Sequence, residues 1–353
     1  MKLFLHVLKL VSVRILAAGV ILVSILQILD LLDVTPDIVE RGLGAAGMLH
    51  YALLRLPRLI DQAAPISVLA GSIFAFMKLA GESSVVAMRA AGISTYRLTA
   101  MALPAALAVV LVDYAAVELV APRTDPALQA WWRDTGAPAA KSEVKERAFR
   151  VGGDVVLATT DDLSGRTLKD MKIYRRDAQG RLVERVQTAQ ATYVGGGWRL
   201  VNPQFVRFGP DGAQPGAAEQ MIWGAAFEPA DVQALFADDQ IVSAASAGRA
   251  LAGGGAERPA SYYATRVQRS VSHPLGVLVM LLLAAPIALA NFRSSQGGVF
   301  VTASLAAGLL FLVVDGLLAA LGESGSITPL FAAWTAPVVF ATLGITALLK
   351  LEG

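Results

Sequence analysis

Cysteine is absent from this chain of 353 residues. Disulfide bonds, thiolate catalysis and zinc–thiolate clusters are therefore excluded. Histidine is also scarce, since the chain has only 3, and His6, His50 and His273 are far apart and lack the spacing of metal ligands. From the spacing of these histidines we expect no metal site.

The chain also lacks the common motifs of nucleotide binding and catalysis. The string nearest to a GxxxxGK[ST] loop is Gly136–Ser142, which has no second glycine. A GxSxG elbow, a His-Glu-x-x-His motif and a pair of catalytic carboxylates are missing as well. We therefore expect a protein that is not an enzyme and that binds no cofactor, ATP included.

Charged residues make up only 16% of the chain, whereas hydrophobic residues make up 55%. The mean hydropathy is +0.56, which is typical of a membrane protein. The net charge of +2 is small, and no basic tract is interleaved with aromatic residues. These features argue against nucleic acid as a partner.

Apolar runs long enough to cross a membrane predict transmembrane helices on both sides of a polar region. The second run, within Leu49–Leu79, is interrupted by Arg55, Pro57, Arg58 and Asp61. We expect a break at the proline, and an earlier part that extends outward or lines something polar. The predicted spans are Ile15–Leu32, Leu49–Leu79 (with Ala63–Met77 as its clean part), Leu98–Ala121, Val271–Ala290, Val299–Leu321 and Leu330–Leu349. Short segments on the side of both termini are richer in Lys and Arg, which favours cytoplasmic termini.

The polar region alternates between polar and apolar residues and contains many β-branched residues. The strands that it predicts are Val151–Thr159, Met171–Arg176, Arg181–Gln187, Ala191–Val194, Trp198–Val201 and Gln204–Phe208. Asp177–Gly180 and Gly195–Gly197 are expected to be hairpin turns, Glu228–Ala237 a short helix, and Gly253–Gly255 a flexible connection. A sandwich, a jelly roll and an open β-structure all fit this pattern.

The predicted architecture is an α-helical membrane protein with six transmembrane helices and an inserted extracytoplasmic β-domain. Residues 1–121 hold the first three helices, residues 122–263 the β-domain, and residues 264–353 the last three helices. We expect the β-domain to resemble a β-jellyroll.

A short amphipathic segment at about residues 81–92 separates the second and third spans. Gly81 can end the incoming helix, Ser83 or Ser84 can cap a new one, and Gly92 suits its C-terminal end. On a helical period Glu82 and Arg89 share one face. Such a helix suits the membrane surface, where it either only floats or meets a soluble partner.

The run Tyr51–Arg97, above all V-V-A-M-R-A-A-G at its end, resembles the lipopolysaccharide export permeases of the LptF/LptG family, and LptG more closely. The resemblance covers nearly the whole chain. It implies that the amphipathic segment is a coupling helix, which docks on a separate cytoplasmic ATPase. The coupling residues that it implies are Glu82, Ser84, Met88, Arg89 and Gly92. The family usually has glutamate where this chain has Ser84, and Glu82 is displaced from that position by about 200° around a helix.

The resemblance also implies a site for the phosphorylated head of the lipid. Arg58, directly after Pro57, matches a basic residue that faces the lipid cavity in the family, and Arg133 matches another if the alignment has a gap. Arg55 is three residues before Arg58 and shares its helix face. Guanidinium groups suit phosphates, although arginines near a helix end also extend to the membrane interface as simple snorkelling residues. Gln27 stands where LptG-type chains have lysine.

Other residues are candidates on weaker grounds. Phe205 and Phe208 fall on opposite faces of one predicted strand, so one of them faces the core and the other a groove that contacts lipid. For Asp113, Glu118 and Asp315 within or beside the spans, we favour helix pairing or gating over a proton relay.

The function that the resemblance implies is that of one permease subunit in an ABC-type lipopolysaccharide exporter of the bacterial inner membrane. Its implied partners are an LptB-like ATPase homodimer, which binds the ATP, a paired LptF-like permease subunit and an LptC/LptA-like periplasmic bridge. A non-transporting sensor or receptor with an extracytoplasmic β-domain is one alternative. A mechanotransmitting ABC permease is the other.

Overall fold

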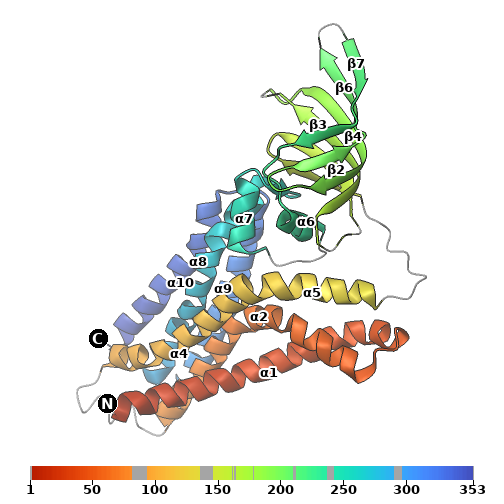
Figure 1. The fold of residues 1–353 in the computed structure, drawn as a ribbon. Coiled ribbons are helices and arrows are strands. Elements are labelled where there is room, and N and C mark those ends of the chain that lie inside the picture. The colour runs from red at the N-terminus through yellow and green to blue at the C-terminus, as the bar shows by residue number, and fades with distance from the viewer. Residues whose placement is uncertain are drawn as a thin grey trace. The chain divides into compact units, whose positions relative to one another are not determined.

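A computed structural model describes residues 2–81, 94–135, 146–160, 162, 164–177, 179–209, 212–236, 242–289 and 296–352. Its internal contacts divide the chain into two compact units (Figure 1). One unit consists of residues 1–121 and 268–353, and the other of residues 122–267. The first unit is helical, and the second is built around a β-sheet.

Within the described residues, 6 helices are long and apolar enough to cross a membrane. This agrees with the apolar runs, because a helix satisfies its own backbone hydrogen bonds in lipid. The helices concerned are α1 (Lys2–Glu40), α2 (Gly44–Gly81), α4 (Thr95–Ala115) with its continuation, α8 (Ala260–Ala284), α9 (Gln296–Glu323) and α10 (Pro329–Glu352). A 3-10 helix, η2 (Ala285–Leu289), extends α8.

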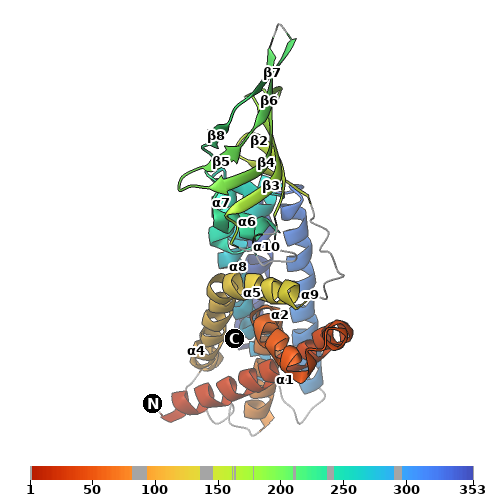
Figure 2. The same cartoon turned by 45° about the vertical axis from the view of Figure 1, so that its right-hand side comes forward.

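The second span is uninterrupted, so the predicted break near Pro57 is wrong. α2 runs through both Pro57 and Pro65, and α1 lies along it in Figures 1 and 2. A Cβ atom on Gly71 would lie only 2.4 Å from the Cα atom of Ile15. A glycine is therefore required where these two helices touch, as is common for membrane helices. Such contacts with neighbouring helices help a membrane helix to tolerate proline.

The third span extends beyond its predicted end. α4 continues into a π-helix, η1 (Ala116–Val120), and then into α5 (Ala121–Asp134). In the π-turn the N–H of Ala121 donates to the carbonyl oxygen of Ala116. Pro122 then falls in the first turn of α5, where a proline is tolerated. The first residues of the predicted β-domain are therefore helical.

The second unit contains one antiparallel sheet whose main path runs in the order β7-β6-β4-β3-β2-β1-β9. β5 pairs with β4 and β8, away from this path. The strands are β1 (Arg147–Val151), β2 (Asp154–Thr159), β3 (Thr167–Arg176), β4 (Leu182–Tyr193), β5 (Trp198–Val201), β6 (Gln204–Gly209), β7 (Gly212–Ala217), β8 (Gln220–Trp223) and β9 (Gly255–Ala256). A helical membrane protein with an inserted β-domain is thus confirmed, while the jellyroll likeness stays a prediction.

Several predicted strand limits are wrong. Val151–Thr159 is a hairpin rather than one strand, because Gly152 at φ +59° turns the chain between β1 and β2. β4 is one strand that covers two predicted ones, since its first half pairs with β6 and its second half with β5. The sequence analysis missed β7 and β8. In β7, G-A-Q-P-G-A contains none of the β-branched residues that indicate a strand.

The hairpin turn at Gly195–Gly197 is present as predicted, with positive φ angles at Gly195 and Gly196. Helix α6 (Pro229–Phe236) lies within the predicted helix, and α7 (Ala244–Leu251) follows it. Gly255 was expected in a flexible connection, but it pairs with Val151. These elements close a core in which Trp198 is fully buried and donates through Nε1 to the carbonyl oxygen of Phe227 at 2.8 Å.

Candidate functional site

A line of ionisable side chains follows α2. Arg55, Arg58 and Asp61 are successive members at a spacing of three residues, so each lies near the next along the helix surface. The Nε atom of Arg55 lies 3.2 Å from Oδ1 of Asp30 on α1. Both side chains are about one-fifth exposed, at 22% and 18%. Arg55 thus holds α1 against α2, a contact that the sequence analysis did not anticipate.

Arg58 follows the buried Pro57 and is half-buried. It lies on the same helix as Arg55, about one turn further along. The structure therefore brings these two predicted residues onto one helix, within the first unit. Their role in holding a lipid head group stays a prediction.

Arg133 belongs to α5 in the second unit, and its side chain lies outside the described part of the chain. Its predicted role as a basic residue of the lipid cavity is thus untested.

The predicted coupling residues fall within residues 82–93, which lie outside the described residues. They are Glu82, Ser84, Met88, Arg89 and Gly92. The helices on both sides are described, since α2 extends to Gly81 and α4 begins after Ser94. The Ser94 hydroxyl accepts a hydrogen bond from the N–H of Arg97 and so caps α4.

The register of β6 assigns the two phenylalanines to opposite faces of the sheet. Phe205 is opposite Val186, which is fully buried in the core. The side chain of Phe205 is partly buried against this core, and its ring lies over Gly216 of β7, where a Cβ atom would be 2.4 Å away. Phe208 lies on the other face and is 41% exposed. Phe205 therefore faces the interior of the domain and Phe208 the exterior.

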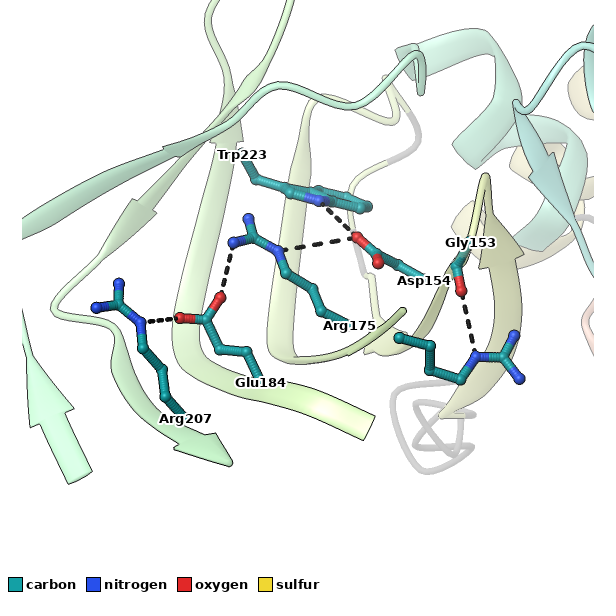
Figure 3. A network of polar contacts seen from close by, with 7 residues as sticks. Gly153, Asp154, Arg175, Glu184, Arg207 and Trp223 are labelled. Atoms are coloured by element: carbon teal, nitrogen blue, oxygen red, sulfur yellow. Dashed lines mark hydrogen bonds and ion pairs between the residues drawn. The ribbon is translucent and has the colours of Figure 1, made fainter. Parts of the chain in front are cut away.

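A chain of polar contacts crosses the same inner face, as Figure 3 shows. Trp223 donates through Nε1 to Asp154 at 3.3 Å, and Nε of Arg175 lies 3.9 Å from the same carboxylate oxygen. The Glu184 carboxylate accepts from Arg175 at 2.7 Å and from Arg207 at 2.8 Å. Glu184 is buried and shares the inner face with the core residues of β4. The inner face is therefore apolar in its middle and carries a row of charged side chains that runs from β2 to β6.

Arg207, at the β6 end of this row of charged side chains, also contacts the aromatic ring of Phe205 on the same strand. The guanidinium of Arg207 lies 4.9 Å from the ring centroid of Phe205, within the range of a cation–π contact. Its side chain is 63% exposed, although Glu184 pairs with it. This end of the inner face thus offers an aromatic ring and a cation next to each other.

A cavity of about 230 Å³ also occurs in the second unit and was not predicted. It lies between α5, α6 and the connection after β2, and its walls are mostly apolar. Its lining residues are Pro126, Ala127, Gln129, Ala130, Thr160, Asp162, Val232, Gln233 and Phe236. The volume is below the range of about 300–1,000 Å³ that is usual for ligand pockets, so the cavity alone does not define a lipid site.

Three ionisable side chains of the first unit lie close together, which the sequence did not predict. His273 on α8 and Asp61 on α2 approach to 3.5 Å, and the buried Asp113 of α4 lies beside them. The sequence carried a partial signal, because Asp113 is an acid within an apolar run. Its partners are on other helices, which sequence spacing does not reveal.

Comparison with known families gives one match, to the model described as lipopolysaccharide export system permease LptF/LptG. The match covers residues 5–350 and thus includes both units of the structure. The comparison with curated proteins found no match.

Proposed function

Because this chain belongs to the lipopolysaccharide export system permease LptF/LptG family, we propose that it is one permease subunit of an ABC-type exporter. In this proposal it takes lipopolysaccharide from the inner membrane and passes it to a periplasmic bridge, driven by a separate cytoplasmic ATPase. The observation that carries the proposal is the family match over residues 5–350, together with a β-domain inserted between membrane helices. The family and the apolar helices support a multi-pass protein of the inner membrane.

The need for partners follows from what the chain contains. Its sequence has no P-loop, so ATP is bound by a partner, for which we propose an LptB-like homodimer. The segment at about residues 81–92, with Glu82 and Arg89, is the proposed docking element for this ATPase. A paired LptF-like subunit encloses the lipid together with this chain, which we assign the LptG role. Both termini are cytoplasmic in this arrangement.

The β-domain supplies the proposed path to the bridge. β7 is a terminal strand of the sheet (Figure 2). Its residues are mostly exposed. A terminal strand has unpaired backbone groups, which another β-protein can extend by adding a strand. An LptC/LptA-like bridge protein is the proposed partner at such an edge. Phe205 on the inner face is the residue of β6 that we propose to contact the lipid.

The head group of the lipid is the proposed ligand of Arg58, helped by Arg133. Arg58 is half-buried on α2, and a guanidinium forms short, charge-assisted hydrogen bonds with phosphate. Arg55 contributes less in this proposal, because Asp30 already pairs with it. The acyl chains supply most of the affinity, and the arginine orients the head.

The test is reconstitution of the chain into vesicles with the partner subunits, followed by measurement of ATP-dependent glycolipid release. Release that requires this chain, ATP and the ATPase supports the proposal. Co-purification from native membranes separates it from its alternatives. A sensor or receptor recovers no ATPase, and a mechanotransmitting permease recovers the ATPase but no glycolipid.

A further inference from the structure

Three ionisable side chains of the first unit converge from helices that are far apart in the sequence. Asp61 lies near the middle of α2, His273 near the middle of α8, and Asp113 in the last turn of α4, just before η1. One possible ligand atom from each residue lies within 4.8 Å of those of the other two. The side chains therefore face a common point between three helices.

The burial of Asp113 distinguishes this cluster from a chance grouping of exposed acids. Its side chain is only 1% exposed, and its Oδ1 atom has no hydrogen-bond partner among the described residues. An unsatisfied carboxylate oxygen in the interior costs free energy, because water has been removed and nothing replaces it. A bound ligand at the common point would satisfy this oxygen.

The charges of the cluster indicate what kind of ligand this is. When His273 is neutral and both carboxyl groups are ionised, Asp61 and Asp113 together carry two negative charges within apolar helices. Charges at such a depth persist when they are paired or when they coordinate a metal ion. A divalent cation neutralises both carboxylates at once.

One imidazole and two carboxylates are donor types that suit a first-row transition metal. Two ligand atoms on a tetrahedral Zn²⁺ are about 3.4 Å apart, given bonds of about 2.0–2.1 Å. The distance from Nε2 of His273 to Oδ1 of Asp61 is 3.5 Å. An imidazole ligand favours zinc and similar metals over magnesium and calcium, which prefer oxygen ligands alone. Three protein ligands leave a fourth position for water.

The backbone next to Asp113 is also unusual. η1 begins three residues after it, and the N–H of Ala116 donates to the carbonyl oxygens of both Val112 and Asp113. Single π-turns in α-helices frequently accompany functional sites. Here the π-turn η1 directly follows the turn that carries Asp113, the residue with the unsatisfied oxygen.

We propose that Asp61, Asp113 and His273 form a binding site for one divalent transition-metal ion, which joins α2, α4 and α8. This site is additional to the proposed export function and does not depend on it. It also departs from the expectation of no metal site, which considered only the spacing of histidines along the chain.

The test uses the purified full-length chain in lipid nanodiscs after treatment with a chelator. Titration with Zn²⁺ is followed by calorimetry, and titration with Co²⁺ by visible absorption. We expect one ion per chain and a Co²⁺ spectrum typical of a tetrahedral site. The substitutions Asp113→Asn, Asp61→Asn and His273→Gln should each weaken binding by at least ~10-fold, a loss that even supporting residues of metal sites cause.

His50→Gln is the matched control, because His50 also lies on α2 but outside the cluster. It should bind Zn²⁺ as the original chain does. Thermal unfolding without metal shows which variants are folded. If Asp113→Asn does not fold, Asp61→Asn tests the site instead, because Asp61 is the more exposed of the two acids. Zn²⁺ should raise the unfolding temperature of the original chain but not of the folded cluster variants. Absence of Zn²⁺ binding, equal binding by Asp61→Asn, or equal loss in His50→Gln would overturn the proposal.

Discussion

Arg269 and Asp315 form an ion pair that joins α8 to α9, with 2.9 Å between Nη2 and Oδ2. The side chains are only 14% and 10% exposed, so solvent and salt screen the pair weakly. Helix pairing was the favoured role of Asp315, and this contact is of the kind that helix pairing requires.

Removal of one partner should destabilise the first unit strongly. In the Asp315→Ala variant the charge of Arg269 is left buried without its carboxylate, and a loss of about 3–5 kcal/mol in the free energy of unfolding is expected. Unfolding in mixed micelles with increasing denaturing detergent measures the loss. The double variant Arg269→Met with Asp315→Leu should recover most of it, because neither charge remains. A double variant as unstable as Asp315→Ala would contradict this account.

Substitutions of Arg58 should change export according to charge and shape. Each charge-assisted hydrogen bond to a phosphate contributes about 1.5–3 kcal/mol. Arg58→Glu should therefore impair glycolipid release more than Arg58→Ala, since repulsion adds to the lost attraction. Arg58→Lys should restore part of the activity, because it keeps the charge but loses the bidentate geometry. Equal release by all three variants would assign Arg58 to the membrane interface instead.

Charge reversal at Glu82 and Arg89 should weaken docking of the ATPase. Both residues lie in the amphipathic segment that the family resemblance implies is the coupling helix, and a helical period places them on the same face. We expect less ATPase to co-purify with Glu82→Lys and with Arg89→Glu, and coupled ATP hydrolysis to fall in parallel. Lys78→Glu, in the last turn of α2, is the control for a general change of charge near this surface. Normal recovery and hydrolysis with both reversals would show that this face is not the docking face.

Photo-crosslinking should distinguish the two faces of β6. A photoreactive residue in place of Phe205 lies on the inner face of the sheet, and one in place of Phe208 lies on the outer face. If lipid passes along the inner face, glycolipid should be labelled at position 205 in the presence of ATP, and position 208 serves as the matched control. Labelling at 208 alone would place the lipid on the outer face. The absence of labelling at both positions would remove this strand from the path.

Asp231 should make the stability of the second unit depend on pH. Burial raises the pKa of this carboxyl group above its ordinary value, although the N–H of Glu228 and the charge of Arg249 oppose the change. The folded state then holds a proton at pH values at which the unfolded chain has lost it. The stabilisation of the folded state by this protonated carboxyl group is fully present below the ordinary carboxyl pKa. It is lost as the pH rises through the raised pKa.

The Asp231→Asn variant has no carboxyl group to ionise at this position, so it does not lose stability in this way. Its unfolding temperature should therefore rise relative to that of the original chain as the pH increases from the ordinary carboxyl pKa through the raised pKa. Asp177→Asn is the comparison of opposite sign. Hydrogen bonds from the backbone N–H and the side chain of Arg181 hold the pKa of Asp177 below its ordinary value. That carboxylate stabilises the fold above the ordinary pKa, and the contribution is lost as the pH falls. Parallel pH profiles for the two variants would contradict both assignments.

The class of fold was predictable from the sequence because its signals are local. A long apolar run predicts a membrane helix, since lipid offers no other partners to backbone groups. Alternation in Gln204–Phe208 predicts a strand, and Gly195–Gly197 predicts the turn between β4 and β5. Proline was the least dependable signal, because α2 continues through Pro57 and α5 contains Pro122 in its first turn.

Only the tertiary structure determines which side chains from different helices and strands meet. The sequence alone identified two faces of β6, but the pairing of Phe205 with Val186 determines which face is inside. Asp61, Asp113 and His273 come from three helices, and their distances depend on how those helices pack. Helical and strand periods describe neighbours within one element, whereas contacts between elements depend on the packing of all of them together.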